Sequence, residues 1–290
     1  MLVREALAQA TFQLENQGVE SPRLDAELLL AHVLGVNRAA LFARPERRLT
    51  LKELTRYRDL VARRAAREPL AYLLGHREFF GLDFVVGPDV LIPRPETELL
   101  VEHALRLARA RPGPVRIADV GTGSGAIAVA LAVHLPEAIV FALDHSPAAL
   151  AIAARNAQSH GVGDRVHFCC GDLLAPLLET VDLIVANLPY VTTGEWEALP
   201  PEIRDHEPRS ALDGGPDGLT FIRRLLETAL PHLQPDGAIL VEIGAGQGQM
   251  VLSLAVQHFP QAHVELYQDY AGWDRIVMIE MRGSQGASGS

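Results

Sequence analysis

Apolar positions in the first 75 residues recur at helical spacing. One apolar stripe runs through residues 24–34 and follows Ser21-Pro22, a pair that favours a helix start because proline at the first helical position needs no hydrogen-bond donor. A second stripe occupies residues 54–61, and its helix is expected to open near Thr50. Residues 1–75 are therefore predicted to form a small helical domain.

Between residues 76 and 92 the apolar period changes from helical to alternating. Every second residue from Phe80 to Val86 is apolar, and Gly87-Pro88 follows. Alternation that ends at such a pair is typical of a strand and a turn. We expect a β-hairpin here that links the helical domain to the rest of the chain.

From residue 93 to 282 short apolar strands alternate with helical segments. A helix is expected over residues 99–107. Strand and helix pairs are then predicted at residues 116–121 with 124–134, and at 139–144 with 147–159. Further strands are predicted at residues 165–170, 181–187, 237–243, 262–268 and 274–281. This order predicts an α/β domain with a mostly parallel sheet covered on both faces. Residues 283–290 are Gly/Ser-rich and are expected to be a flexible tail.

Composition and charge narrow the class of protein. Of 290 residues, 48% are hydrophobic and 21% are charged, so the chain has ample material for a core and is not disordered as a whole. A net charge of -10 argues against stable binding to nucleic acid. The charge is uneven, because residues 1–75 hold 12 Lys or Arg against 9 Asp or Glu, whereas residues 76–290 hold 14 against 27.

The basic residues of the first part include four at spacings that share one helix face: Lys52, Arg56, Arg63 and Arg67. This face is either a solvated helix surface, the more common case, or a docking face for an acidic partner or RNA.

Sequence features also favour a cytoplasmic location. The most apolar stretch, residues 125–143, is interrupted by His134, Pro136 and Glu137, so we expect no membrane span. The only cysteines, Cys169 and Cys170, are neighbours that ordinary disulfide geometry does not join, which indicates a reducing compartment. The eleven histidines include no helical pair at metal-ligand spacing, and no metal site is expected.

A glycine-rich segment lies where the first core strand meets its helix. It comprises Asp119, Gly121, Thr122, Gly123, Ser124 and Gly125. Glycines at such a junction let the backbone turn tightly and approach a ligand, and Asp144, near the end of the next strand, suits a ribose diol. The pattern fits a site for S-adenosylmethionine, a nicotinamide or flavin site, or a purely structural turn.

Two further segments follow later strands. Asp172 could accept a hydrogen bond from an adenine amino group, with Leu173 against the adenine face, although an Asp at a strand end is more often a turn former. A second glycine-rich run over residues 244–248 follows a late strand and is interpreted as a turn rather than a second nucleotide site.

The most specific chemistry lies in Asn187, Leu188, Pro189 and Tyr190, which follow the buried strand at residues 181–187. In an open parallel sheet this motif faces the same crevice as the glycine-rich loop. An amide nitrogen attacks poorly because its lone pair is delocalised. The Asn187 side-chain oxygen and the Leu188 carbonyl could hold a planar NH₂ group, and Tyr190 offers a flat surface beside it.

At these residues the chain resembles Rossmann-like, S-adenosylmethionine-dependent methyltransferases, and it resembles the PrmC (HemK) family most closely. The matching segments include residues 68–72, Phe79-Phe80-Gly81, residues 90–98 with Pro93-Arg94-Pro95-Glu96-Thr97-Glu98, Glu207-Pro208, residues 214–219 and Asp274-Arg275. Leu188 stands where that family usually has proline.

The resemblance implies methylation of the N5 nitrogen of the glutamine in the Gly-Gly-Gln loop of peptide chain release factors. S-adenosylmethionine would lie over the glycine-rich loop, and the release factor would be the partner, held with help from the helical domain. Arg94 and Glu96 would border the cofactor or the bound loop.

Three other functions fit parts of the sequence. The form Asn-Leu-Pro-Tyr also occurs in ribosomal RNA adenine dimethylases, so an adenine N6-methyltransferase acting on RNA or DNA is the main alternative. A degenerate methyltransferase fold that serves as a ligand sensor or scaffold is another, and a nicotinamide oxidoreductase is the third.

Overall fold

A computed structural model describes residues 1–282, which divide into two compact units. Unit 1 comprises Met1–His76 together with Pro200–His206, and unit 2 comprises the described residues of Arg77–Leu199 and of the chain from Glu207 onward. The predicted tail, residues 283–290, lies outside the described residues. No helix within residues 1–282 has the length and apolarity needed to cross a membrane.

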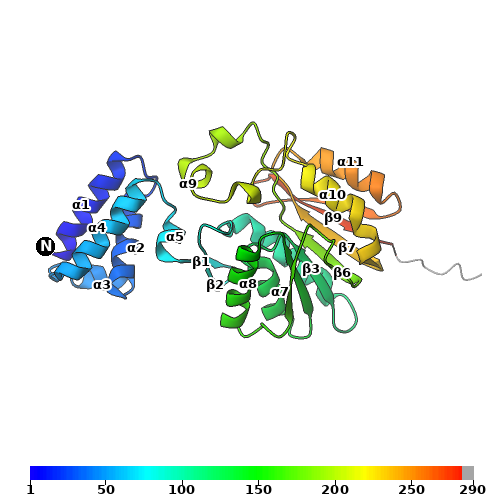
Figure 1. Cartoon of the computed structure of the whole chain (residues 1–290), viewed down its shortest axis with the longest axis horizontal. Helices are drawn as coiled ribbons and strands as arrows, with labels where there is room; N and C mark the ends of the chain where they lie inside the picture. Colours follow the sequence, from blue (N-terminus) through cyan, green and yellow to red (C-terminus); the bar gives the residue numbers. More distant parts are fainter. Residues whose placement is uncertain (283–290) are drawn as a thin grey trace, which may run out of the picture. The chain divides into compact units, whose positions relative to one another are not determined.

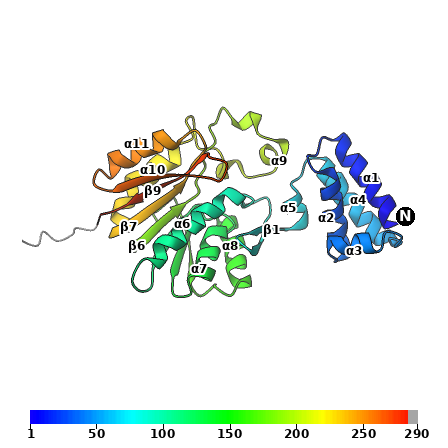
Figure 2. The same cartoon turned by 180° about the vertical axis from the view of Figure 1, so that it is seen from behind.

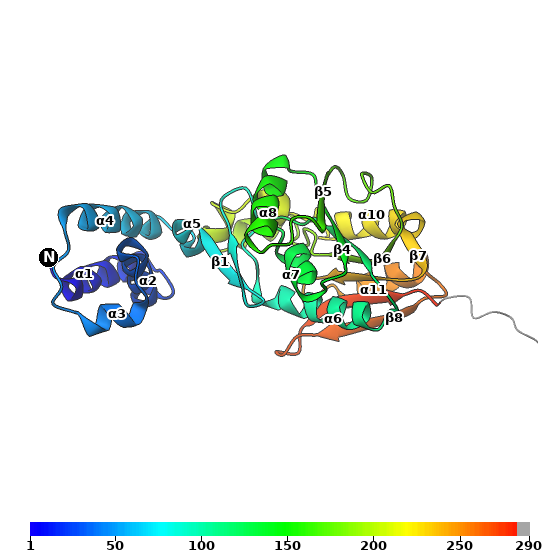
Figure 3. The same cartoon turned by 90° about the horizontal axis from the view of Figure 1, so that it is seen from below.

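Unit 1 contains the predicted helical bundle. Its helices are α1 (Val3–Asn16), α2 (Pro22–Leu34), α3 (Arg38–Ala43), α4 (Leu51–Ala65), α5 (Leu70–Leu74) and α9 (Pro201–Arg204). Helices α1, α2 and α4 pack against one another (Figure 3). Helix α4 begins as expected at Thr50, whose hydroxyl accepts from the Glu53 backbone N–H at 3.3 Å while the Glu53 carboxylate accepts from Thr50 N–H at 2.8 Å.

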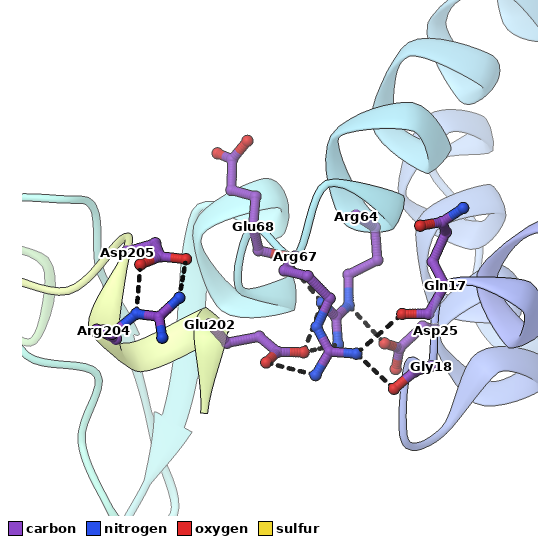
Figure 4. Close-up of polar contacts among 9 residues, drawn as sticks. All are labelled: Gln17, Gly18, Asp25, Arg64, Arg67, Glu68, Glu202, Arg204 and Asp205. Atoms are coloured by element: carbon purple, nitrogen blue, oxygen red, sulfur yellow. Dashed lines mark hydrogen bonds and ion pairs between the residues drawn. The ribbon is translucent and has the colours of Figure 1, made fainter. Parts of the chain in front are cut away.

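Segment Pro200–His206 joins the N-terminal helices through ion pairs that the sequence did not indicate. The buried Arg64 guanidinium lies between the Asp25 carboxylate, at 2.7 Å, and the Glu202 carboxylate, at 3.1 Å (Figure 4). Arg67 contacts Glu202 at 2.7 Å and also donates to the Gln17 carbonyl at 3.2 Å. Residues more than 130 positions apart leave no local pattern, so nothing in residues 200–206 pointed to unit 1.

The predicted basic helix face is only partly present. Helix α4 ends at Ala65, and Arg67, with φ of 70°, lies beyond it, so the prediction that all four basic residues share one helix face was wrong. Arg67 is held by Glu202, Arg63 forms an ion pair with Glu68 at 2.5 Å, and Arg56 contacts the His32 ring nitrogen at 3.3 Å. Three of the four cations are therefore engaged within unit 1, which favours the structural interpretation over the docking one.

Replacing Arg64 with alanine is expected to lower the free energy of unfolding by roughly 3 kcal/mol, because Asp25, also buried, would lose its charged partner. Urea unfolding of the full chain, followed by circular dichroism, measures the change. Arg4→Ala is the matched control, since its pair with Glu46 is exposed and should contribute less than about 1 kcal/mol. Equal losses in the two variants would contradict the expectation.

The predicted hairpin is present, but its turn was placed wrongly. Strands β1 (His76–Phe79) and β2 (Leu82–Val85) are joined at Phe80-Gly81, whereas the alternation had suggested a single strand that turns at Gly87-Pro88. Phe80 and Gly81 have φ of 51° and 73°, and the Glu78 carboxylate accepts from the Gly81 N–H at 2.7 Å. Phe79 and Phe84 are fully buried on either side of the turn, so packing at both ends of the hairpin favours this register.

Unit 2 is built on a seven-stranded sheet in the order β5-β4-β3-β6-β7-β9-β8. Its strands are β3 (Arg116–Val120), β4 (Ile139–Asp144), β5 (Val166–Cys170), β6 (Val181–Ala186), β7 (Leu233–Glu242), β8 (His263–Gln268) and β9 (Asp274–Glu280). Strand β9 runs antiparallel to both of its neighbours, and the strands from β5 to β7 are parallel. The strand order reverses between β3 and β6, the point where open α/β sheets bind ligands beyond the carboxyl ends of their strands.

Helices cover both faces of this sheet (Figures 1 and 2). The helices of unit 2 are α6 (Glu98–Arg109), α7 (Ala126–His134), α8 (Pro147–Ser159), α10 (Thr220–Ala229) and α11 (Gly248–His258), with short 3-10 turns at Pro95–Thr97, Trp196–Ala198, Arg209–Ala211 and Leu230–His232. Ile117 faces the core under α6 and α7, whereas its neighbour Ala118 faces the core under α10 and α11. Burial on both faces explains why the strands are nearly continuous apolar runs.

Candidate active site

A cavity of about 500 Å³ lies beyond the carboxyl ends of β3, β4 and β6. Eight of the predicted site residues line it: Gly121, Gly123, Asp144, Asp172, Leu173, Asn187, Leu188 and Pro189. Segments separated by about 70 residues in the chain therefore share one wall. The volume falls in the range of small-molecule sites, on the order of 300 to 1,000 Å³.

The glycine-rich loop follows β3 in a conformation that needs glycine. Gly121 and Gly125 have φ of 77° and 79°, and a Cβ on Gly125 would lie 2.9 Å from the Ala153 Cβ. Asp119 braces the loop from below, because its carboxylate accepts from the Thr122 hydroxyl at 2.6 Å and from the Ala128 N–H at 3.1 Å. Burial raises the pKa of Asp119 to about 7.

Ser124 contributes to the loop through its backbone carbonyl rather than its side chain. Its carbonyl accepts from the Asn156 side-chain amide at 2.8 Å, and Asn156 also holds the backbone of Val85 in the hairpin. The hairpin and the loop are thereby fixed to the same helix, α8.

Asp144, at the end of β4, lies on the cavity wall with its carboxylate already oriented. One oxygen accepts from the Gly123 N–H and the other from the Ser146 N–H, both at 2.9 Å. Each carboxylate oxygen has a second lone-pair position, so the group can still accept hydrogen bonds from a diol.

Asp172 and Leu173 follow β5, the strand that pairs with β4. The Asp172 carboxylate forms an ion pair with Arg224 from α10, a partner that the sequence did not suggest. Arg224 contacts the Oδ2 atom, which leaves the Oδ1 atom for another donor. Leu173 has φ of 48° and lines the cavity.

The Asn187 to Tyr190 motif leaves the end of β6. The Asn187 side-chain amide donates to the Thr97 hydroxyl at 3.0 Å. Leu188 is buried, and a Cβ on Gly121 would lie 3.1 Å from its Cδ2 atom, so the leucine side chain packs directly on the glycine-rich loop. Residue 188 therefore joins the two loops by apolar contact.

Tyr190 lies beside the cavity wall rather than in the set of residues that lines it. Burial, followed by the nearby Glu242 carboxylate, raises the pKa of its hydroxyl to about 12. The Tyr190 carbonyl accepts from the Gln247 side-chain amide at 2.9 Å. Gln247 belongs to the second glycine-rich run, so this turn, which leads into α11, supports the motif.

Arg94 and Glu96 do not line the cavity. Arg94 instead contacts the buried Glu207 carboxylate at 2.5 Å, and Glu207 also accepts from the Ile92 N–H at 3.1 Å. The ion pair therefore holds the Pro-Arg-Pro-Glu-Thr-Glu segment against Glu207, whose neighbour Pro208 lines the cavity.

Several lining residues were not predicted as site residues, although residues 90, 91 and 208 belong to segments that carried the resemblance. They include residues 88–91 after the hairpin, His145, Ser146 and Ala149 next to Asp144, the segment with Pro208, Ser210, Ala211 and Asp213, and Phe221 on α10. Gly87-Pro88 had been interpreted only as a turn in a linker. Within residues 1–282, no group of three or more His, Cys, Asp or Glu side chains is arranged to hold a metal ion.

Comparisons with known proteins agree with this architecture. A family model described as a methyltransferase domain matches residues 117–206, and one described as the PrmC N-terminal domain matches residues 5–75. A crystal structure of a methyltransferase from Pyrococcus furiosus has a TM-score of 0.52 at 18% identity and covers 76% of this chain and 96% of its own, which shows the fold alone. The sheet order and these matches define a Rossmann-like methyltransferase with an N-terminal helical bundle.

Full-length relatives specify the family. The release factor glutamine methyltransferase of Geobacter sulfurreducens is 49% identical over 276 residues, 95% of each chain. That of Moorella thermoacetica is 47% identical over 286 residues, 97% of this chain and 99% of its own. The chain belongs to the release factor glutamine methyltransferase family.

Proposed function

We propose that this chain transfers a methyl group from S-adenosylmethionine to the N5 nitrogen of the glutamine in the Gly-Gly-Gln loop of peptide chain release factors. The observation that supports this most is the cavity, because Gly121, Asp144 and Asn187 share its wall. Family membership supports the same reaction. We also propose that the reaction takes place in the cytoplasm, and the net charge of -10 supports a chain that does not bind nucleic acid stably.

The residues of the cavity fit S-adenosylmethionine. Free lone pairs on Asp144 suit the two ribose hydroxyls, Asp172 Oδ1 suits the adenine amino group, and Leu173 offers apolar surface to the ring. The cofactor supplies an electrophilic methyl group on a sulfonium sulfur when it is bound.

The Asn187 motif is the proposed site of the glutamine amide. Asn187 Oδ1 and the Leu188 carbonyl would each accept one N–H of the substrate NH₂ group, and Tyr190 would lie against its plane. These acceptors stabilise the positive charge that develops on the substrate nitrogen as the N–C bond forms and the C–S bond breaks. The extra proton on nitrogen then leaves to water.

A defined peptide provides the test. The purified protein is incubated with S-adenosylmethionine and an unmethylated recombinant release factor, and the mass of the tryptic peptide that carries the Gly-Gly-Gln loop is measured. We expect a gain of one methyl group on the glutamine, lost in Asn187→Ala. An unmodified peptide, with methyl transfer to adenine in RNA or DNA instead, would overturn the proposal in favour of the adenine alternative, which the relatives named above do not support.

Replacing Asp144 with asparagine is expected to weaken S-adenosylmethionine binding roughly 10-fold to 100-fold, because hydrogen bonds to a charged group contribute about 1.5 to 3 kcal/mol. Isothermal titration calorimetry gives the dissociation constant. NADH is titrated in parallel, and tight binding of NADH by the wild type would favour the oxidoreductase alternative. An unchanged constant for S-adenosylmethionine would remove Asp144 from the cofactor site.

A further inference from the structure

A buried carboxylate lies directly behind the Asn187 motif. Ala186 on β6 pairs with Val241 on β7, so the next residues, Asn187 and Glu242, are neighbours at the carboxyl ends of adjacent strands. Glu242 is only 1% exposed and does not line the cavity. Its Oε2 atom has no hydrogen-bond partner. A carboxylate is costly to bury in this way, which makes a purely structural role unfavourable.

Two polar side chains approach this carboxylate. The side chains of Thr97 and Asn187 both lower the pKa of Glu242, and the Asn187 Nδ2 atom donates to the Thr97 hydroxyl oxygen at 3.0 Å. Thr97, 4% exposed, ends the turn at Pro95–Thr97. The three groups therefore form a small closed network beneath the cavity wall.

The donors and acceptors available in this network determine which way the Asn187 amide faces. An ionised carboxylate only accepts, so a Thr97 or Asn187 side chain that faces Glu242 can interact with it favourably only as a donor. The single Thr97 proton is then used, and Thr97 can only accept from Asn187. Both requirements place the NH₂ group of Asn187 toward Glu242 and Thr97, and the Oδ1 atom becomes the end of the amide that is available to a substrate.

We propose that Glu242 and Thr97 are positioning residues that hold the Asn187 amide with its oxygen toward the substrate NH₂ group. This inference rests on the proposed function. An inverted amide would present NH₂ to NH₂, two donors facing each other, and methyl transfer would lose its acceptor.

The network is also sensitive to pH. Burial, with a smaller contribution from the Glu96 carboxylate, raises the pKa of Glu242 to about 7, while Thr97, Arg275 on β9 and Asn187 oppose the shift. The Tyr190 hydroxyl also faces this group. A protonated Glu242 can donate, so it no longer excludes the inverted amide. Activity is therefore expected to fall as the pH drops below about 7.

Three variants test the network. In Thr97→Val, kcat for methylation of the release factor should fall roughly 10-fold to 100-fold, the loss of a hydrogen bond to a charged group, with an unchanged dissociation constant for S-adenosylmethionine. Thr97→Ser should recover most of kcat, because it keeps the hydroxyl. Glu242→Gln should lower kcat at pH 8, and its kcat should no longer fall as the pH is lowered from 8 to 6.

A stability measurement separates positioning from a structural role. The folded-state pKa of Glu242 lies above its ordinary value, so its ionised form destabilises the fold at pH 8, and Glu242→Gln should raise Tm there while it lowers kcat. Equal kcat in wild type and Thr97→Val would overturn the inference. So would a kcat of Glu242→Gln that still falls between pH 8 and pH 6. A wild type with no transfer to the release factor would instead overturn the proposed function.

Discussion

Replacing Asn187 with alanine is expected to lower kcat for methylation of the release factor about 100-fold to 1,000-fold, with little change in the affinity for S-adenosylmethionine. The substitution removes the proposed acceptor for the substrate N–H group. Loss of one preorganised hydrogen-bonding group at a developing charge typically reduces kcat by about this factor. The Leu188 carbonyl, which no side-chain substitution removes, accounts for the residual rate.

Single-turnover kinetics with saturating cofactor measures this loss, because it isolates chemistry from product release. Ser210→Ala serves as the control, since Ser210 also lines the cavity but is assigned no role in transfer. The assignment of Asn187 fails if its variant raises KM for the release factor and keeps kcat. That pattern would mean that Asn187 binds the substrate equally in the ground state and the transition state.

Replacing Gly218 with alanine is expected to lower the free energy of unfolding by about 2 to 4 kcal/mol and to abolish most activity. Gly218 has φ of 72°, and an added Cβ would lie 2.3 Å from the Tyr190 carbonyl oxygen, a backbone atom that cannot rotate away. The left-handed conformation by itself costs an alanine roughly 1 to 2 kcal/mol. Relief of the clash would also shift Tyr190 and break its hydrogen bond from Gln247.

Thermal unfolding and transfer assays together measure this effect, with an expected drop of roughly 2 to 4 °C in Tm per kcal/mol. Gly246→Ala is the matched control, because no atom lies within 4 Å of the Cβ position at Gly246 and its φ is not positive. A Gly218→Ala protein with normal Tm and activity would show that the motif tolerates displacement at this point.

The close approach at Gly218 recurs four residues earlier in the same loop. A Cβ on Gly214 would lie 2.5 Å from the Pro189 carbonyl oxygen. Residues 214–219 contributed to the family resemblance, but their sequence gave no physical reason for the glycines. The structure supplies one, because the backbone of the Asn187 motif lies against them.

Residue 188 illustrates a different outcome. A residue before proline favours an extended backbone, so Leu188 in front of Pro189 keeps its carbonyl available without the usual proline. The structure adds that the side chain is buried and packs on the glycine-rich loop near Gly121. Sequence reasoning had considered only the backbone carbonyl, because packing partners of an isolated apolar residue cannot be identified from one chain.

Local pattern was sufficient for most of the fold. The predicted strand at residues 139–144 and helix at 147–159 agree with β4 and α8, because each buries an apolar face whose period is visible in a short window. The glycine-rich loop and the Asn187 motif could likewise be placed at strand ends. In a parallel sheet, the carboxyl ends of adjacent strands lie at the same edge, so their meeting at one cavity follows from the strand assignment.

By itself, then, the sequence determined the strands of the sheet, the helices α6, α7 and α8 but not α10 or α11, the loops at the strand ends and the residue types suited to methyl transfer. The tertiary structure alone decided which distant side chains meet: Glu202 with Arg64, Arg224 with Asp172, and Glu242 with Thr97 and Asn187. The physical reason is the distance along the chain over which each effect acts. Periodicity and turn chemistry act over a few residues, whereas a buried ion pair or polar network depends on positions that only the completed fold brings into contact.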